Sequence, residues 1–281
     1  MIGEMDIEDL KNIIYNNHDI DFILKDKIFE CAELIIRKYP IAYRNLYANL
    51  ETITIRHPNN DEEIELKNKG VDSAYKAQHN LMLLSAKGVN SKNYKNLILH
   101  ELFHVASFDG NNIGFTSFDN KGKSLNEGMT EYLVQTISND NNIMPIYNSD
   151  YENIKLLCNV ITVEKLINSY FSEGLLGLFR DYDTKIGTDN LNELIRLMDL
   201  EHLQRGLENK YKNQYIKLFL QELSKLEFDD MKKIQIVMEN ISSFLEIQYN
   251  CNIPNEITNA SLETIRVIGI KYLNSRKKTN E

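Results

Sequence analysis

The chain has 281 residues, with 32 Lys and Arg against 41 Asp and Glu and a formal net charge of −9 at pH 7. A composition of 42% hydrophobic and 26% charged residues predicts a soluble globular protein and excludes the disordered, collagen-like and fibrous classes. The acidic excess disfavours nucleic acid and anionic membrane surfaces as partners, because binding either one needs clustered Lys and Arg.

The start of the chain and its cysteines predict a compartment. The first ten residues, MIGEMDIEDL, hold four acidic residues and lack the apolar run of a secretory signal. The longest apolar runs are far shorter than the roughly 20 residues that span a bilayer. Cys31, Cys158 and Cys251 lie far apart without a CxxC pair, which favours free thiols in a reducing compartment. We therefore predict a cytoplasmic protein.

The first part of the chain predicts helices. Only 12 Gly and 4 Pro occur in the whole chain, so few residues interrupt a helix. Apolar residues in the segment 7–39 recur at helical spacing and predict two helices, separated near residues 16–19. The second helix should end before Pro40, because the residue that precedes a proline disfavours helical geometry.

Three short segments then predict a small sheet. Leu50–Ile55 (LETITI) alternates with a period of two and is rich in β-branched residues, which indicates a strand. Ile64–Leu66 predicts an edge strand, and Asn80–Ser85 a buried or half-buried strand. We expect the last of these to offer an edge on which an extended peptide can pair, with an ordinary sheet strand as the alternative.

The middle of the chain predicts two helices around a loop. Helical periodicity returns at residues 94–108 and again from about 126 to 137. The segment 109–123 between them is rich in Gly, Asn and Asp and predicts a loop or a short hairpin. Asp109 and Asp119 lie in this loop, where we expect them to make local turn hydrogen bonds.

A linker and a helical second half complete the pattern. Residues 138–150 (SNDNNIMPIYNSD) are typical of a linker. Helical periodicity then covers 151–171, 190–208, 211–226, 230–247 and 259–273. We predict an α+β, mainly helical fold in three parts: an N-terminal helical segment (1–48), a core in which a small sheet packs on the 94–108 helix (49–140), and a helical C-terminal subdomain (141–281).

His100, Glu101 and His104 form the pattern HExxH within a predicted helix. Residues i and i+4 share a helical face, with Cβ atoms roughly 5–6 Å apart, so two imidazoles can bind one tetrahedral Zn²⁺. Glu101 would lie beside the metal and accept a proton from metal-bound water, whose pKa the metal lowers to about 7. The intervening Leu102 and Phe103 would point into the core. The alternative is two histidines that make ordinary polar contacts.

A catalytic zinc site needs a third protein ligand and one open position. The metzincin pattern would place a histidine at position 110, where this chain has Gly110. The segment LNEGMTEY offers Glu127 and Glu131 instead, spaced i, i+4 so that both can face a metal. Glu127 also completes the pattern Ser124-x-x-Glu127, a capping box in which its side chain would fold back onto the Ser124 amide.

The sequence HELFH followed by LNEGMTEYL resembles the gluzincin zinc peptidases, which include thermolysin-like and aminopeptidase N-like enzymes. In the aminopeptidases a similar LNEG carries the third zinc ligand, which maps onto Glu127. In the thermolysin-like enzymes an acidic residue shortly after Asn-Glu orients the first ligand histidine, which maps onto Glu131. The resemblance covers residues 97–133 only, and the 22 residues between His104 and Glu127 are somewhat more than in those families.

The resemblance implies a zinc-dependent peptidase that acts on a peptide or protein substrate. Zn²⁺ would be bound by His100, His104 and Glu127, with Glu101 as general base and Glu131 as the residue that orients His100. Residues 49–140 would then be a zincin-like catalytic core. Two alternatives stay open: a non-catalytic regulator or interaction protein that retains a metallopeptidase fold, and a zinc hydrolase of a non-peptide substrate.

A gluzincin-type site also includes a Tyr or His that donates a hydrogen bond to the oxyanion of the tetrahedral intermediate. The candidates are Tyr132, Tyr151, Tyr182 and His202. Each of them is expected in the first place to be a packing residue with a solvated polar tip, and the sequence does not choose among them. Oligomeric state has no signature in the sequence.

Overall fold

Helices dominate the part of the chain that the computed structural model describes. This part comprises residues 4–117, 119–138, 147–158, 160–186 and 190–203, with Tyr211, Gln214 and Leu218. A three-stranded sheet among helices makes the fold α+β and mainly helical, as predicted. Most of the predicted linker and of the predicted helices after residue 203 (211–226, 230–247 and 259–273) lies outside the described residues.

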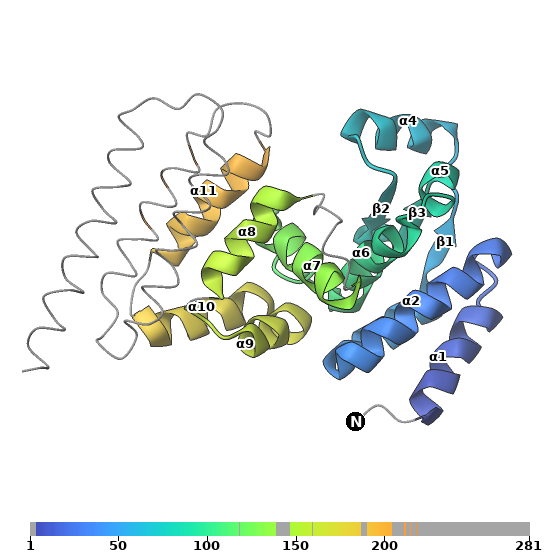
Figure 1. Cartoon of the computed structure of the whole chain (residues 1–281), viewed down its shortest axis with the longest axis horizontal. Helices are drawn as coiled ribbons and strands as arrows, with labels where there is room; N and C mark the ends of the chain where they lie inside the picture. The colour runs from blue at the N-terminus through green and yellow to red at the C-terminus, as the bar shows by residue number, and fades with distance from the viewer. Residues whose placement is uncertain are drawn as a thin grey trace, which may run out of the picture.

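Helices α6 and α7 lie in the middle of the molecule, between the N-terminal helices and α8 to α11 (Figure 1). The helices are α1 (Glu4–Asn16), α2 (Lys25–Lys38), α3 (Tyr43–Thr52), α4 (Asn60–Lys69), α5 (Ala86–Val89), α6 (Tyr94–Ser107), α7 (Lys123–Ser138), α8 (Asn148–Leu157), α9 (Val163–Asn168), α10 (Gly174–Ile186) and α11 (Leu191–Leu203). The strands are β1 (Thr54–Arg56), β2 (Ser73–Lys76) and β3 (Leu81–Leu84). None of the described helices is long and apolar enough to cross a membrane.

The two predicted N-terminal helices are confirmed as α1 and α2. Lys25 stabilises the turn between them, because its Nζ donates hydrogen bonds to the carbonyl oxygens of Tyr15 (2.7 Å) and Asn17 (2.9 Å). The Asn17 side chain in turn donates to the carbonyl oxygens of Leu50 and Ile53, both at 3.0 Å. These bonds satisfy carbonyl groups that helix ends leave without a partner, and they tie the end of α1 to the end of α3.

Strand β3 lies in the centre of the sheet, between β1 and β2. It is parallel to β1 and antiparallel to β2, with Met82 opposite Ile55 and Leu84 opposite Ser73. The prediction that this segment offers an edge to a peptide is therefore wrong, and the alternative, an ordinary sheet strand, is correct. The residues from Met82 to Leu84 are fully buried, as expected for a strand that is paired on both sides. Both β1 and β2 are outer strands; Ile20 bridges the outer side of β1 at Ile55, whereas β2 pairs only with β3 among the described residues, so the unpaired outer edge is that of β2.

Residues 64–66, predicted as an edge strand, belong to helix α4. A capping box starts this helix: Asn59 Oδ1 accepts a hydrogen bond from the Glu62 amide, and Glu62 Oε2 accepts one from the Asn59 amide. Gly70 ends it with a left-handed φ of 68°. These end signals outweigh a short apolar alternation. LETITI is likewise only partly a strand, because its first three residues complete α3.

The helices predicted at 94–108 and 126–137 are confirmed as α6 and α7, with a turn-rich loop between them. Helix α6 contacts α2, α3, α7 and β2 and is therefore central to the core. Leu102 and Phe103 are fully buried in it, as predicted. Buried apolar side chains from Leu10 to Met198 form one cluster. The division of the chain at residues 48 and 140 stays a prediction.

The described second half is helical, as predicted, with differences at 151–171 and at 174–186. Helix α8 ends at Leu157, and Thr162 starts the separate helix α9 by accepting a hydrogen bond from the Lys165 amide. Helix α10 follows in a segment that the sequence analysis leaves unassigned. Up to residue 203, the described C-terminal part thus consists of several short helices around α7.

Gly128 allows α8 to lie directly against α7. A Cβ atom at this position would stand 2.1 Å from the backbone oxygen of Asp150, far inside van der Waals contact. Because Gly128 follows Glu127 on α7, the same close approach brings Asp150 and the start of α8 next to the candidate site.

We therefore expect Gly128→Ala to lower the free energy of unfolding by about 2–3 kcal/mol, as overpacking in a core does. Gly70→Ala is the matched control: its Cβ would meet no atom within 4 Å, but its φ is 68°. A residue with a Cβ in the left-handed conformation lowers the free energy of unfolding by about 1 kcal/mol. Denaturant unfolding measures both, and equal losses for the two variants would contradict the close approach of α7 and α8.

Candidate metal centre

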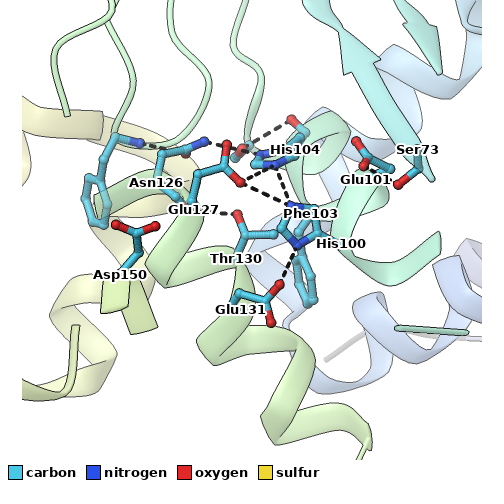
Figure 2. Close-up of polar contacts among 12 residues, drawn as sticks. Ser73, His100, Glu101, Phe103, His104, Asn126, Glu127, Thr130, Glu131 and Asp150 are labelled. Atoms are coloured by element: carbon cyan, nitrogen blue, oxygen red, sulfur yellow. Dashed lines mark hydrogen bonds and ion pairs between the residues drawn. The ribbon is translucent and has the colours of Figure 1, made fainter. Parts of the chain in front are cut away.

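Helices α6 and α7 bring His100, His104 and Glu127 together in a buried cluster (Figure 2). His100 Nε2 lies 3.1 Å from His104 Nε2 and 3.2 Å from Glu127 Oε2. His104 Nε2 lies 3.6 Å from the same carboxylate oxygen. Three ligand atoms from two helices thus face one small volume, and this group could hold a metal ion.

The spacing of these three atoms fits zinc. A tetrahedral Zn²⁺ with bonds of about 2.0–2.1 Å separates its ligand atoms by about 3.3 Å. The observed separations of 3.1, 3.2 and 3.6 Å lie on both sides of that value. Two imidazoles and one carboxylate also suit zinc better than Ca²⁺ or Mg²⁺, which prefer a shell of oxygen ligands.

The beginning of α7 decides between the two interpretations of Glu127. The helix starts at Lys123, so Ser124 lies inside it rather than at its N-cap. The Ser124 amide donates to Asp199 Oδ1 of α11 (2.9 Å), and its hydroxyl donates to Asp150 Oδ1 (2.7 Å). The capping-box interpretation is therefore wrong: an aspartate from α11 accepts the bond from the Ser124 amide, and Glu127 faces the histidines.

Glu131 lies one turn further along α7, on the far side of His100 from the cluster. His100 Nδ1 is 3.1 Å from Glu131 Oε1. Because a carboxylate accepts hydrogen bonds, Nδ1 carries the proton and Nε2 is the nitrogen that can bind a metal. The Glu131 side chain is buried, which keeps this contact away from water.

Asn126 contacts the other histidine, His104, but in the opposite sense, because its amide nitrogen donates to Nδ1 where Glu131 accepts from it; the sequence-based prediction did not include this residue. Its Nδ2 lies 3.2 Å from His104 Nδ1, and its Oδ1 accepts a hydrogen bond from the Phe115 amide at 3.2 Å. Asn126 is the residue before Glu127 in the NEG sequence. Its position in that motif was a usable signal, but the residue that holds it, Phe115, lies 11 residues earlier in a loop whose path the sequence does not fix.

The charges of the cluster favour a cation. Burial alone would lower the pKa of His100, but hydrogen bonds to Glu127 and Glu131 raise it to about 10. Burial would raise the pKa of Glu127, but the neighbouring His104 and His100 hold it well below its usual range. The protein alone therefore keeps a proton among these groups, and a metal ion that binds here would displace it.

Glu101 is buried but does not join the cluster. Its carboxylate Oε1 accepts a hydrogen bond of 2.6 Å from the hydroxyl of Ser73, the first residue of β2. Figure 2 shows Glu101 and Ser73 together on the side of α6 that faces the sheet. The residue predicted as general base thus lies next to the ligand histidines without being a ligand.

Tyr147 and His202 form a further wall beside the cluster. The Tyr147 ring stacks on His100, with 5.5 Å between centroids, and on His202, with 6.0 Å. His202 Nδ1 lies 2.9 Å from Asp150 Oδ2. His202 is one of the predicted candidates for the oxyanion donor. Tyr147 was not among them, because it lies in the segment predicted as a linker.

The other oxyanion candidates pack with aromatic or core side chains. Tyr132 and Tyr151 stack on each other, with 6.2 Å between ring centroids, and Tyr182 is fully buried on α10.

In the loop before α7, Asp109 Oδ1 accepts hydrogen bonds from the amides at 111 and 112, both at 2.7 Å. Asp119 similarly accepts a bond from the amide at 121, so both aspartates make the local turn contacts expected of them.

Comparison of the chain with protein-family models, with curated proteins and with solved structures finds no match. The resemblance to gluzincins therefore rests on the motif residues alone. The arrangement of those residues in space adds to the motif, because the motif does not state how α7 packs on α6.

We expect the protein to bind one zinc ion per chain and to lose it in His104→Ala and in Glu127→Ala. His79→Ala is the control, since His79 is exposed and lies outside the cluster. Glu131→Gln should keep the zinc but weaken its binding about 10- to 100-fold, as changes in residues that orient a ligand do. Metal analysis after dialysis measures the zinc content of these four variants and of Glu131→Ala. Zinc retained by Glu127→Ala but lost by Glu131→Ala would transfer the ligand role to Glu131.

Proposed function

We propose that the protein is a zinc-dependent peptidase of the gluzincin type. The observation that supports this most strongly is the spacing of His100, His104 and Glu127, whose ligand atoms lie 3.1 to 3.6 Å apart. Three protein ligands leave a tetrahedral zinc with one position for water, which is the arrangement of catalytic rather than structural zinc sites.

The residues around the cluster would have separate roles in hydrolysis. Bound zinc supplies Lewis acidity and lowers the pKa of a water molecule. Glu101 would accept a proton from that water and pass it to the leaving amine. Glu131 holds His100 in the tautomer that presents Nε2. His202, oriented by Asp150, and Tyr147 are the candidates for hydrogen-bond donors to the oxyanion.

The outer edge of β2 supports a peptide as the substrate. Helix α6 packs against this strand, so an extended chain paired with β2 would lie along the helix that carries the HExxH residues. Backbone pairing of this kind recognises peptides of many sequences. A non-peptide substrate would make no use of it.

The non-catalytic alternative accounts less well for Glu101. A regulator that kept only a structural metal would have no need of a carboxylate that is buried next to the ligands. A fourth protein ligand would also be expected, because structural zinc sites are usually closed. Among the described residues no fourth side chain joins the His100, His104 and Glu127 group.

We also propose that the protein works in a reducing, cytoplasmic setting. Cys31 and Cys158 are both free of disulfides. Burial raises the pKa of the Cys31 thiol to about 12 and that of Cys158 to about 11. Both thiols are therefore protonated and poorly reactive near neutral pH.

Cleavage of a peptide library tests the proposed function. The zinc-loaded wild type should cleave, and Glu101→Gln should lower kcat/KM by about 100-fold or more with unchanged zinc content, since it removes the general base. Glu63→Gln, an exposed position on α4, is the matched control and should cleave like the wild type. No cleavage of any peptide by the wild type would sink the peptidase proposal, and full activity in Glu101→Gln would sink the mechanism.

A further inference from the structure

Ser73 links the edge strand of the sheet to the carboxylate of Glu101. Its hydroxyl donates to Glu101 Oε1 at 2.6 Å, and Glu101 is only 5% exposed. A carboxylate that is buried to this extent needs a hydrogen-bond partner. Here the partner is the hydroxyl of Ser73, which orients the carboxylate.

The register of the sheet fixes where this hydroxyl lies. Ser73 is paired with Leu84 in the central strand, and the carbonyl of the preceding Asp72 accepts a hydrogen bond of 2.9 Å from the Ser85 amide. Alternate residues of a strand share a face. Tyr75, two residues further along β2, packs edge-on against Phe108 at the end of α6, with 6.3 Å between centroids. The face that carries Ser73 therefore lies on α6 along the whole strand.

This contact has a consequence for the metal cluster. Glu101 directly follows the ligand His100, and a divalent cation attracts any carboxylate that can reach it. The bond from Ser73 engages Oε1 and turns the carboxylate toward the sheet. Oε2 is the oxygen that can then take a proton from water.

We propose that Ser73 is a positioning residue that holds the Glu101 carboxylate beside the metal and off it. This rests on the zinc site of the proposed function. Strand β2 would then have two roles. Its outer edge would align the peptide backbone, and Ser73 at its start would align the general base. Substrate and base would then be positioned by the same rigid element.

Four serine variants test this role. Ser73→Ala and Ser73→Val remove the hydroxyl, Ser73→Thr keeps it with the same shape as valine, and Ser91→Ala is an exposed control. Loss of a hydrogen bond to a charged group should lower kcat about 10- to 100-fold in the alanine and valine variants, with little change in KM. Ser73→Thr and Ser91→Ala should resemble the wild type. The Thr and Val pair keeps the test valid if Ser73→Ala fails to fold.

The visible spectrum of the Co²⁺-substituted protein gives a readout that does not depend on activity. When Glu101 is released onto the metal, the coordination number rises and the cobalt absorption weakens in Ser73→Ala and Ser73→Val. The double variant Ser73→Ala with Glu101→Ala should recover the wild-type spectrum. Cobalt spectra that are the same with and without the hydroxyl would overturn the role of Ser73. Altered spectra in a protein that cleaves no peptide would support that role and remove the proposed function.

Discussion

Two imidazole nitrogens and a carboxylate oxygen within 3.6 Å of one another compete for protons unless a cation lies between them. This constraint connects most features of the molecule. The His100 proton shared with Glu127 and Glu131 satisfies it in the protein alone, and a metal ion would satisfy it better. The residues around the cluster then serve to keep the three candidate ligand atoms in place.

Rigid packing around α6 and α7 maintains that arrangement. The core side chains of α6 anchor it against α2 and α3, while Gly128 lets α8 approach the other side of α7. Bonds from Glu131 and Asn126 fix the two histidine rings, and Asp199 of α11 accepts a bond from the Ser124 amide near the start of the helix that carries Glu127. Elements far apart in the sequence therefore meet at one site, and each of them holds one of its side chains or helices in position.

Local sequence patterns predict the features of the site that depend on the geometry of single helices. The i, i+4 spacing of His100 and His104 and of Glu127 and Glu131 is a property of single helices, and the apolar pattern of α6 predicts which of its residues, such as Phe103, face the core. The interpretation of Glu127 as a cap fails because the start of α7 is set by Asp199, 75 residues after Ser124. Ser73 and Tyr147 could not be found, since sheet register and the position of α8 bring them to the site. Residues 64–66 were misjudged because the signals at the ends of a helix outweigh its apolar pattern.

X-ray absorption at the zinc edge of the metal-loaded full chain tests the central claim most directly. The spectrum reports the type, number and distance of the atoms that bind the ion. The account predicts two imidazole nitrogens and oxygen ligands, all at about 2.0–2.1 Å, in a four-coordinate shell. Sulfur ligands at about 2.3 Å, or a shell with fewer than two imidazoles, would contradict it.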